Sequence, residues 1–102
     1  MTRTDRFGLT QETINAINSI FNRYGQVEKV LIYGSRAMGN FRPGSDIDLT
    51  MVAPTLTMTE LLAIENQLDD LLLPYKIDLS LHHQIDNESL LDHIRRVGRV
   101  FA

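Results

Sequence analysis

The sequence contains no cysteine, so a disulfide framework and a thiolate zinc site are both excluded. Long apolar runs are also missing: the longest apolar clusters, such as LLLPY, fall far short of a membrane span. The first residues, MTRTDRFGLTQE, are polar and lack the apolar stretch of a signal peptide. We therefore expect a soluble, cytoplasmic protein with no part in the membrane.

Positive charge is scarce as well. Ten Lys and Arg residues stand against 13 Asp and Glu residues, which gives a formal net charge of -3. This balance argues against a protein that binds duplex DNA by neutralising its phosphates. It still allows a small phosphorylated ligand, because a metal ion can supply positive charge locally.

The chain shows no internal repeat, linker or low-complexity tract. Its 102 residues, 43% of them hydrophobic, are enough for one compact core with little to spare. We therefore expect a single domain over 1–102.

Apolar spacing and turn residues predict three helices and three strands, with Thr10, Thr57 and Asn87 as helix N-caps. The predicted elements are a helix over 11–24, a strand over 27–33, a strand over 47–53, a helix from 58 to about 73, a strand over 76–82 and a helix from 88 to 95 or 96. A short helical turn is expected near Ala37. This order predicts an α/β (α+β) fold, a small mixed or mostly antiparallel sheet with helices packed on it.

Acidic residues interrupt two of the predicted strands, in GSDIDLTMV (44–52) and YKIDLSL (75–81). Because strand residues alternate between faces, Asp46 and Asp48 share one face, and Asp78 can join them if the strands are neighbours. Clustered carboxylates repel one another, and a divalent cation such as Mg²⁺ reverses that cost. The alternative is that Asp46 is a turn residue and Asp48 lies exposed at the sheet edge.

A Gly34-Ser35 pair follows the first predicted strand and opens the short helical turn. Glycine allows a close approach of the backbone to a phosphate, and amides and a hydroxyl at a helix start bind anions. The segment is not a Walker A loop, because it has no Lys-Ser/Thr pair at the required place. Taken by itself, the pair is equally compatible with a plain turn.

The combined pattern GSRAMGNFRPGSDIDL resembles the signature of the DNA-polymerase-β-like nucleotidyltransferase superfamily: Gly-Ser, ten intervening residues, then Asp-x-Asp. Asp78 in KIDLS supplies the third acid of that signature. The short chain and its ending, NESLLDHIRRVGRVFA, resemble the minimal nucleotidyltransferases of the MNT or MntA type, which are usually paired with a HEPN-domain partner. Met38 departs from the pattern, since a basic residue is frequent there in these proteins, and this weakens the case for one triphosphate contact.

The resemblance implies specific roles for motif residues. Asp46, Asp48 and Asp78 would be catalytic and would hold two Mg²⁺ ions, with ATP as the substrate. The nucleotide-binding residues implied by the motif are Gly34, Ser35, Arg36 and Ser45.

The resemblance also implies an antitoxin that transfers AMP from ATP to a tyrosine hydroxyl of its HEPN ribonuclease toxin, within a hetero-oligomer. One alternative is an antitoxin that neutralises its HEPN partner by stoichiometric binding, with little catalysis. Another is a small-molecule nucleotidyltransferase, although such enzymes usually carry a further domain for the acceptor.

Overall fold

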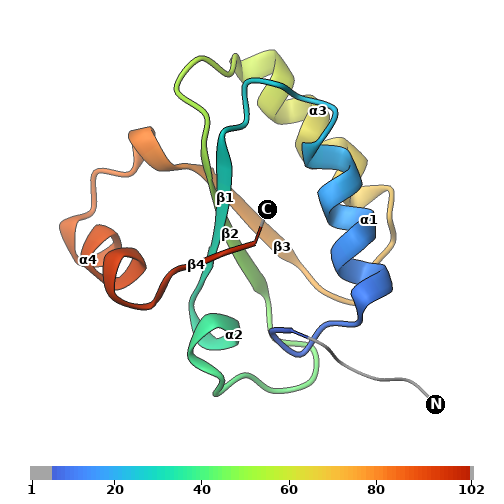
Figure 1. Ribbon diagram of the computed structural model, residues 1–102, viewed down its shortest axis with the longest axis vertical. Coiled ribbons are helices and arrows are strands. Elements are labelled where there is room, and N and C mark those ends of the chain that lie inside the picture. The colour runs from blue at the N-terminus through green and yellow to red at the C-terminus, as the bar shows by residue number, and fades with distance from the viewer. Residues whose placement is uncertain (1–5, 102) are drawn as a thin grey trace.

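The structure is a computed structural model, and it describes residues 6–101 (Figure 1). Its elements are α1 (Gln11–Phe21), β1 (Lys29–Tyr33), α2 (Ser35–Met38), β2 (Ile47–Val52), α3 (Met58–Asp69), β3 (Ile77–Leu81), the 3-10 helix η1 (His82–Gln84), α4 (Glu88–Val97) and β4 (Arg99–Val100). The predicted α/β class is thereby confirmed. None of the helices in the described range has the length and hydropathy that a bilayer crossing requires.

The four strands form one mixed sheet in the order β3-β2-β1-β4. The strand β1 pairs antiparallel with both β2 and β4, whereas β2 and β3 are parallel. A parallel pair needs a crossover connection, and α3 provides it. The sheet is therefore mixed as predicted, but it contains a fourth, two-residue strand that the sequence analysis did not anticipate.

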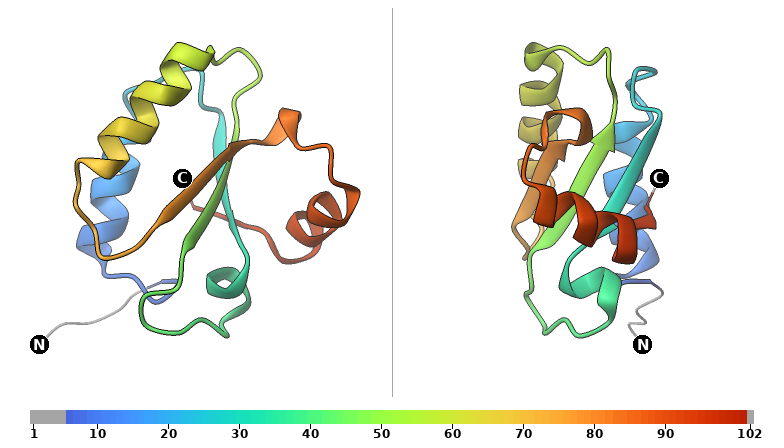
Figure 2. Two further views of the ribbon diagram at one scale, coloured as in Figure 1. Left: turned by 180° about the vertical axis from the view of Figure 1, so that it is seen from behind. Right: turned by 90° about the vertical axis from the view of Figure 1, so that its left-hand side faces the viewer.

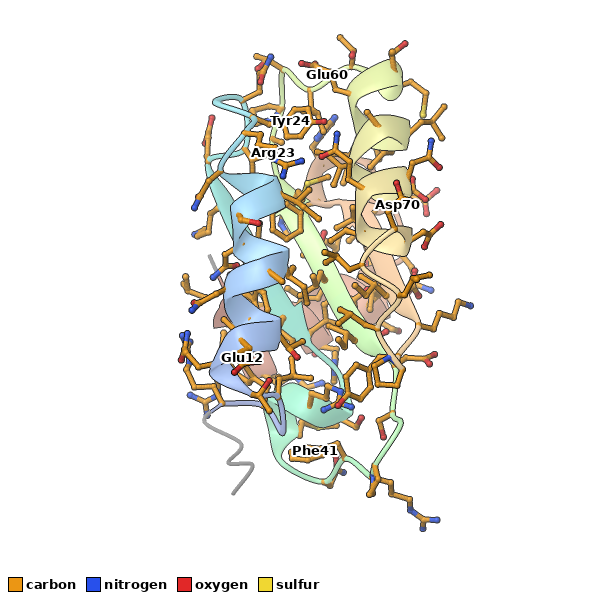
Figure 3. All side chains as sticks on the ribbon, turned by 90° about the vertical axis from the view of Figure 1, so that its right-hand side faces the viewer. Glu12, Arg23, Tyr24, Phe41, Glu60 and Asp70 are labelled. Atoms are coloured by element: carbon orange, nitrogen blue, oxygen red, sulfur yellow. The ribbon has the colours of Figure 1, made fainter. Side chains whose placement is uncertain are left out.

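Helices cover the two faces of the sheet unequally. The helices α1 and α3 lie side by side and antiparallel on one face, while α4 lies on the other (Figures 1 and 2). Figure 3 views the α1–α3 layer directly, with Tyr24, just beyond the end of α1, turned toward α3. There, the Gln67 amide of α3 donates a hydrogen bond of 2.9 Å to the Tyr24 hydroxyl.

The main core lies between the sheet and the α1–α3 layer. Ile77 and Leu79 of the edge strand β3 are only partly buried on this face, whereas the residues of β1 and β2 and the helix residues that meet them at the centre are completely buried. These core residues include Val30, Ile32, Ile47, Leu49, Met51, Ile17 and Ile64, each 0% exposed. Because the pleat alternates, the polar residues between them on β2 face the opposite side, toward α4.

The predicted helix caps are confirmed, but α1 and α3 end earlier than predicted, whereas α4 ends slightly later, at Val97 instead of 95 or 96. The side chains of Thr10, Thr57 and Asn87 each accept a hydrogen bond from a backbone N–H in the first turn. The helix α1 ends at Phe21 instead of Tyr24, because the next backbone N–H groups bond three residues back in a tighter turn. Similarly, α3 ends at Asp69, so the apolar residues at 71–73 belong to the connection rather than to the helix.

The cap of α3 provides a test of local stability. The Thr57 hydroxyl accepts from the Glu60 N–H at 3.1 Å, and the Glu60 carboxylate accepts from the Thr57 N–H at 3.0 Å. We expect Thr57→Ala to lower the free energy of unfolding by about 1 kcal/mol, measured by urea denaturation. The matched control is Thr59→Ala, an exposed position in the same helix, which should change stability by less than about 0.5 kcal/mol. Equal losses in both variants would contradict the role of the cap.

Candidate active site

Two of the three acids are direct neighbours in the sheet. In the parallel β2–β3 pair, Asp48 is in register with Asp78, and on the other side of β2, Asp48 is in register with Tyr33. Asp46 immediately precedes β2 and lies two residues before Asp48, so it points to the same side. The acids therefore gather on the α4 face of the sheet, at the end near α2 (Figure 1).

The pKa values of this region reflect both burial and crowding. Burial raises the pKa of the Asp48 carboxyl, the negative charges of Asp78 and Asp46 raise it further, and His93 partly offsets the rise. Burial also raises the pKa of the Tyr33 hydroxyl; the adjacent Ser80 hydroxyl lowers it, and the charges of Asp48 and Asp78 add to the rise. The site is thus built at an electrostatic cost that a bound cation would remove.

The chemistry of the donor set fits Mg²⁺, which prefers oxygen ligands from carboxylates together with water and phosphate. Within residues 6–101, however, no three His, Cys, Asp or Glu side chains already lie in positions that could hold a metal ion together. Asp46 and Asp78 are exposed, so packing does not fix the rotamers of their side chains. The metal-binding roles of Asp46, Asp48 and Asp78 therefore stay a prediction.

Gly34 allows Asp48 to approach the start of α2. Its backbone has φ 75° and ψ -156°, a region that essentially only glycine occupies. A β-carbon on Gly34 would overlap the Oδ2 atom of Asp48. Gly34 is also the N-cap residue of α2, and Ser35 is its first residue. Since the first N–H groups of a helix have no partner within it, this corner presents free donors beside the acids.

Arg36 is placed differently from its neighbours in the motif. Only 3% of it is exposed, and its guanidinium donates to the carbonyl oxygen of Ser45 at 2.9 and 3.1 Å and to that of Phe7 at 2.8 Å. The guanidinium also lies 4.7 Å from the ring centroid of Tyr75 and 5.2 Å from that of Phe41. Arg36 therefore ties together the loop before β2 and the segment before α1.

Ser45 also participates in this loop. Its hydroxyl accepts from the Arg42 N–H at 2.8 Å, and its own N–H donates to the Arg42 carbonyl at 3.0 Å, which closes a turn over 42–45. These contacts fix the backbone immediately before Asp46. The nucleotide-binding roles of Arg36 and Ser45 stay predictions, and the contacts observed for both residues are structural.

Two residues of the site were not anticipated from the sequence. His93 of α4 accepts a hydrogen bond from the Gly34 N–H at its Nε2 atom, at 3.0 Å, and its ring meets the Tyr33 ring edge-on at 6.1 Å. The available signal was that His93 falls on the apolar stripe of α4, three residues after Leu90 and four before Val97. Tyr33 gave only the ordinary signal of an aromatic residue in a strand.

A model of the family described as polymerase beta, nucleotidyltransferase, matches residues 15–102. The chain belongs to this nucleotidyltransferase family. A comparison with curated protein sequences gives no match.

Solved structures with the same fold include MntA-type antitoxins. One chain of a toxin–antitoxin crystal structure with AMP-PNP superposes on this nucleotidyltransferase with a TM-score of 0.70 at 20% identity, covering 87% of this chain and 72% of that chain. A chain of the MntA–HepT toxin–antitoxin gives 0.66 at 18% identity, covering 91% and 72%. A third, from a tri-AMPylated Shewanella oneidensis HEPN toxin in complex with MNT antitoxin, gives 0.65 at 18% identity, covering 90% and 71%. At these identities the likeness shows the nucleotidyltransferase fold.

The close contact at Gly34 can be tested against a second glycine of similar conformation. Gly39 also has a positive φ, 85°, but a β-carbon there would meet nothing within 4 Å. We expect Gly39→Ala to cost about 1 kcal/mol from backbone strain alone. Gly34→Ala should cost roughly 2–4 kcal/mol, because overlap with Asp48 is added to the strain. Both values come from urea denaturation, and equal costs would show that Asp48 does not press against Gly34.

The raised pKa of Asp48 predicts how stability depends on pH in the metal-free protein. Since the folded-state pKa lies above the ordinary value of 3.8, the folded state binds more protons than the unfolded state between these two values. The contribution of Asp48 to the free energy of unfolding is fully present below the ordinary pKa and is lost as pH rises through the folded-state pKa. Asp48→Asn should therefore be more stable than wild type at pH 7, by a margin that shrinks toward about pH 4.

This comparison is made by urea denaturation in the presence of a chelator. The control is Asp86→Asn, an exposed acid that does not contribute to the pKa shift of Asp48. If Asp48→Asn were less stable than wild type at pH 7, the carboxylate would be stabilising and the sign of its pKa shift would be wrong.

Proposed function

We propose that this nucleotidyltransferase is the antitoxin of a HEPN/MNT toxin–antitoxin pair and transfers AMP from ATP to a tyrosine hydroxyl of its HEPN toxin. The observation that carries the proposal is the side-by-side placement of Asp48 and Asp78, with Asp48 against Gly34 at the start of α2. The fold shared with MntA antitoxins in toxin–antitoxin complexes supports the choice of partner. One such complex contains an AMPylated HEPN toxin, which supports the choice of reaction.

In this proposal, Asp46, Asp48 and Asp78 hold two Mg²⁺ ions. When bound, Mg²⁺ supplies positive charge that stabilises the triphosphate and the departing pyrophosphate. The loop around Ser45, tied down by Arg36, fixes the backbone from which Asp46 projects. Catalysis of this kind depends mainly on positioning and on charge stabilisation.

The start of α2 binds the β- and γ-phosphates. Ser35 offers a hydroxyl and a backbone N–H there, and the absence of a side chain at Gly34 lets the Asp48 carboxylate lie next to them. Held in this way, the triphosphate turns its α-phosphorus toward the acids. Met38, which is half exposed, contributes no positive charge to this corner.

The transfer itself is a single displacement. The tyrosine oxygen of the toxin forms a bond to the α-phosphorus of ATP, the bond from that phosphorus to the bridging oxygen breaks, and pyrophosphate leaves. Asp78, exposed beside Asp48, accepts the tyrosine proton. The described part of the chain is small, and its main core lies on the opposite face of the sheet. The toxin itself therefore forms the rest of the pocket around its acceptor tyrosine.

The proposal predicts that the purified protein, incubated with ATP, Mg²⁺ and the HEPN protein from the neighbouring open reading frame, adds AMP mass to that protein. Asp46→Asn and Asp48→Asn should each abolish the transfer, as measured by intact-protein mass spectrometry. Asp69→Asn, an exposed acid at the end of α3, is the matched control and should transfer at the wild-type rate. Transfer at the wild-type rate by both site variants would show that the metal site is wrongly assigned.

The same variants separate catalysis from simple binding. An Asp46→Asn, Asp48→Asn double variant should still bind the HEPN protein but fail to suppress its toxicity. If the double variant suppresses toxicity as well as wild type does, the antitoxin acts by stoichiometric binding and transfer is not its mechanism.

A further inference from the structure

The helix α4 packs loosely over the site. Ile94 is the only buried residue of α4. A cavity of about 270 Å³ lies beside it, lined by Leu31, His82, Leu91, Ile94, Arg95 and Gly98. The right-hand view of Figure 2 shows α4 lying across the sheet on the face away from α1 and α3. Apolar packing alone therefore does not determine where α4 sits relative to the active site.

A polar contact joins α4 to the start of α2. The Nε2 atom of His93 accepts from the Gly34 N–H at 3.0 Å, across 59 residues of sequence. Among the described residues, this is the only hydrogen bond from an α4 side chain to another helix, strand or loop. The His93 ring is oriented by its edge contact with Tyr33, whose interplanar angle is 80°. Because Nε2 accepts, it carries no hydrogen in this arrangement.

The bonded N–H belongs to the peptide between Tyr33 and Gly34, where β1 ends and α2 begins. An acceptor on this N–H fixes the plane of that peptide, and with it the unusual backbone conformation of Gly34. Ser35 follows this peptide directly, so the orientation of its backbone N–H and side chain depends on the same turn. The contact leaves the N–H of Ser35 available, so His93 supports the phosphate-binding corner without occupying it.

We propose that His93 is a positioning residue for nucleotide binding, which holds the Gly34 peptide so that Ser35 and the start of α2 face the triphosphate. This inference rests on the proposed function, because it takes that corner to be the phosphate site. The opposite role would be competition, in which the imidazole blocks a donor that the phosphate needs. The two roles predict opposite changes in nucleotide affinity when the acceptor is removed.

Two variants separate the acceptor atom from the ring. His93→Phe keeps an aromatic ring against Tyr33 but removes the acceptor, whereas His93→Gln keeps an acceptor at a similar reach but removes the ring. His83→Phe is the control, because His83 is exposed in η1. Thermal unfolding followed by circular dichroism checks that each variant folds.

The first measurement needs no nucleotide. In nuclear magnetic resonance spectra of the ¹⁵N-labelled full chain, a scalar coupling between the Gly34 amide nitrogen and Nε2 of His93 is expected across the hydrogen bond. The Gly34 amide should exchange faster with solvent in His93→Phe and at close to the wild-type rate in His93→Gln. A Gly34 amide that is unchanged in both variants would overturn the inference, whatever reaction the protein catalyses.

The second measurement is calorimetric titration with a non-hydrolysable ATP analogue and Mg²⁺. We expect His93→Phe to weaken binding about fivefold, which corresponds to about 1 kcal/mol, with His93→Gln and His83→Phe close to wild type. Unchanged or tighter binding by His93→Phe would overturn the positioning role. A wild-type protein that binds no analogue would overturn the proposed function and this role together, and the Gly34 resonance would then report on the contact by itself.

Discussion

The carboxylate of Asp48 lies against the backbone of Gly34, so closely that a β-carbon at residue 34 would overlap one of its oxygens. This approach joins the end of β1 to the beginning of β2, which are antiparallel neighbours. Because β2 is also in register with β3, Asp78 lies beside Asp48 on the side of β2 away from β1. One contact between a side chain and a glycine thus brings this pair of acids to the start of α2, the corner proposed to bind phosphate.

The two faces of the sheet have separate tasks. The face toward α1 and α3 is largely buried and supplies the main core, so its residues stabilise the fold. The other face carries acids at one end and is covered by a helix that buries little. Residues that would be costly in a core, such as Asp48, are therefore tolerated where burial is only partial.

Local signals in the sequence were sufficient for much of this architecture. The caps at Thr10 and Thr57 depend on residues within one helical turn, and the adjacency of Asp48 and Asp78 follows from two strands joined by one crossover helix. The strand β4 escaped prediction because two residues cannot show a period. The hydrogen-bond partners of Arg36 and His93 could not be predicted for another reason. These partners lie far away in the sequence, and nothing about an arginine or a histidine indicates which backbone group it will bond. In the case of Arg36, the motif suggested a phosphate contact, whereas the structure shows a guanidinium already surrounded by carbonyl oxygens and aromatic rings.

The turn before α1 has a wider consequence. Phe7 and Gly8 both have positive φ angles, 57° and 72°, and the carbonyl oxygen of Phe7 accepts from the same guanidinium that holds Ser45. Three hydrogen bonds from a single side chain therefore connect this turn with the backbone next to Asp46. A displacement of this turn would therefore be transmitted to the acid-bearing loop, although the two lie far apart along the chain. The residues at the end of β4 are tied to the same turn, because the Arg6 guanidinium donates to the Val100 carbonyl at 3.0 Å and the Phe7 and Phe101 rings lie 6.0 Å apart.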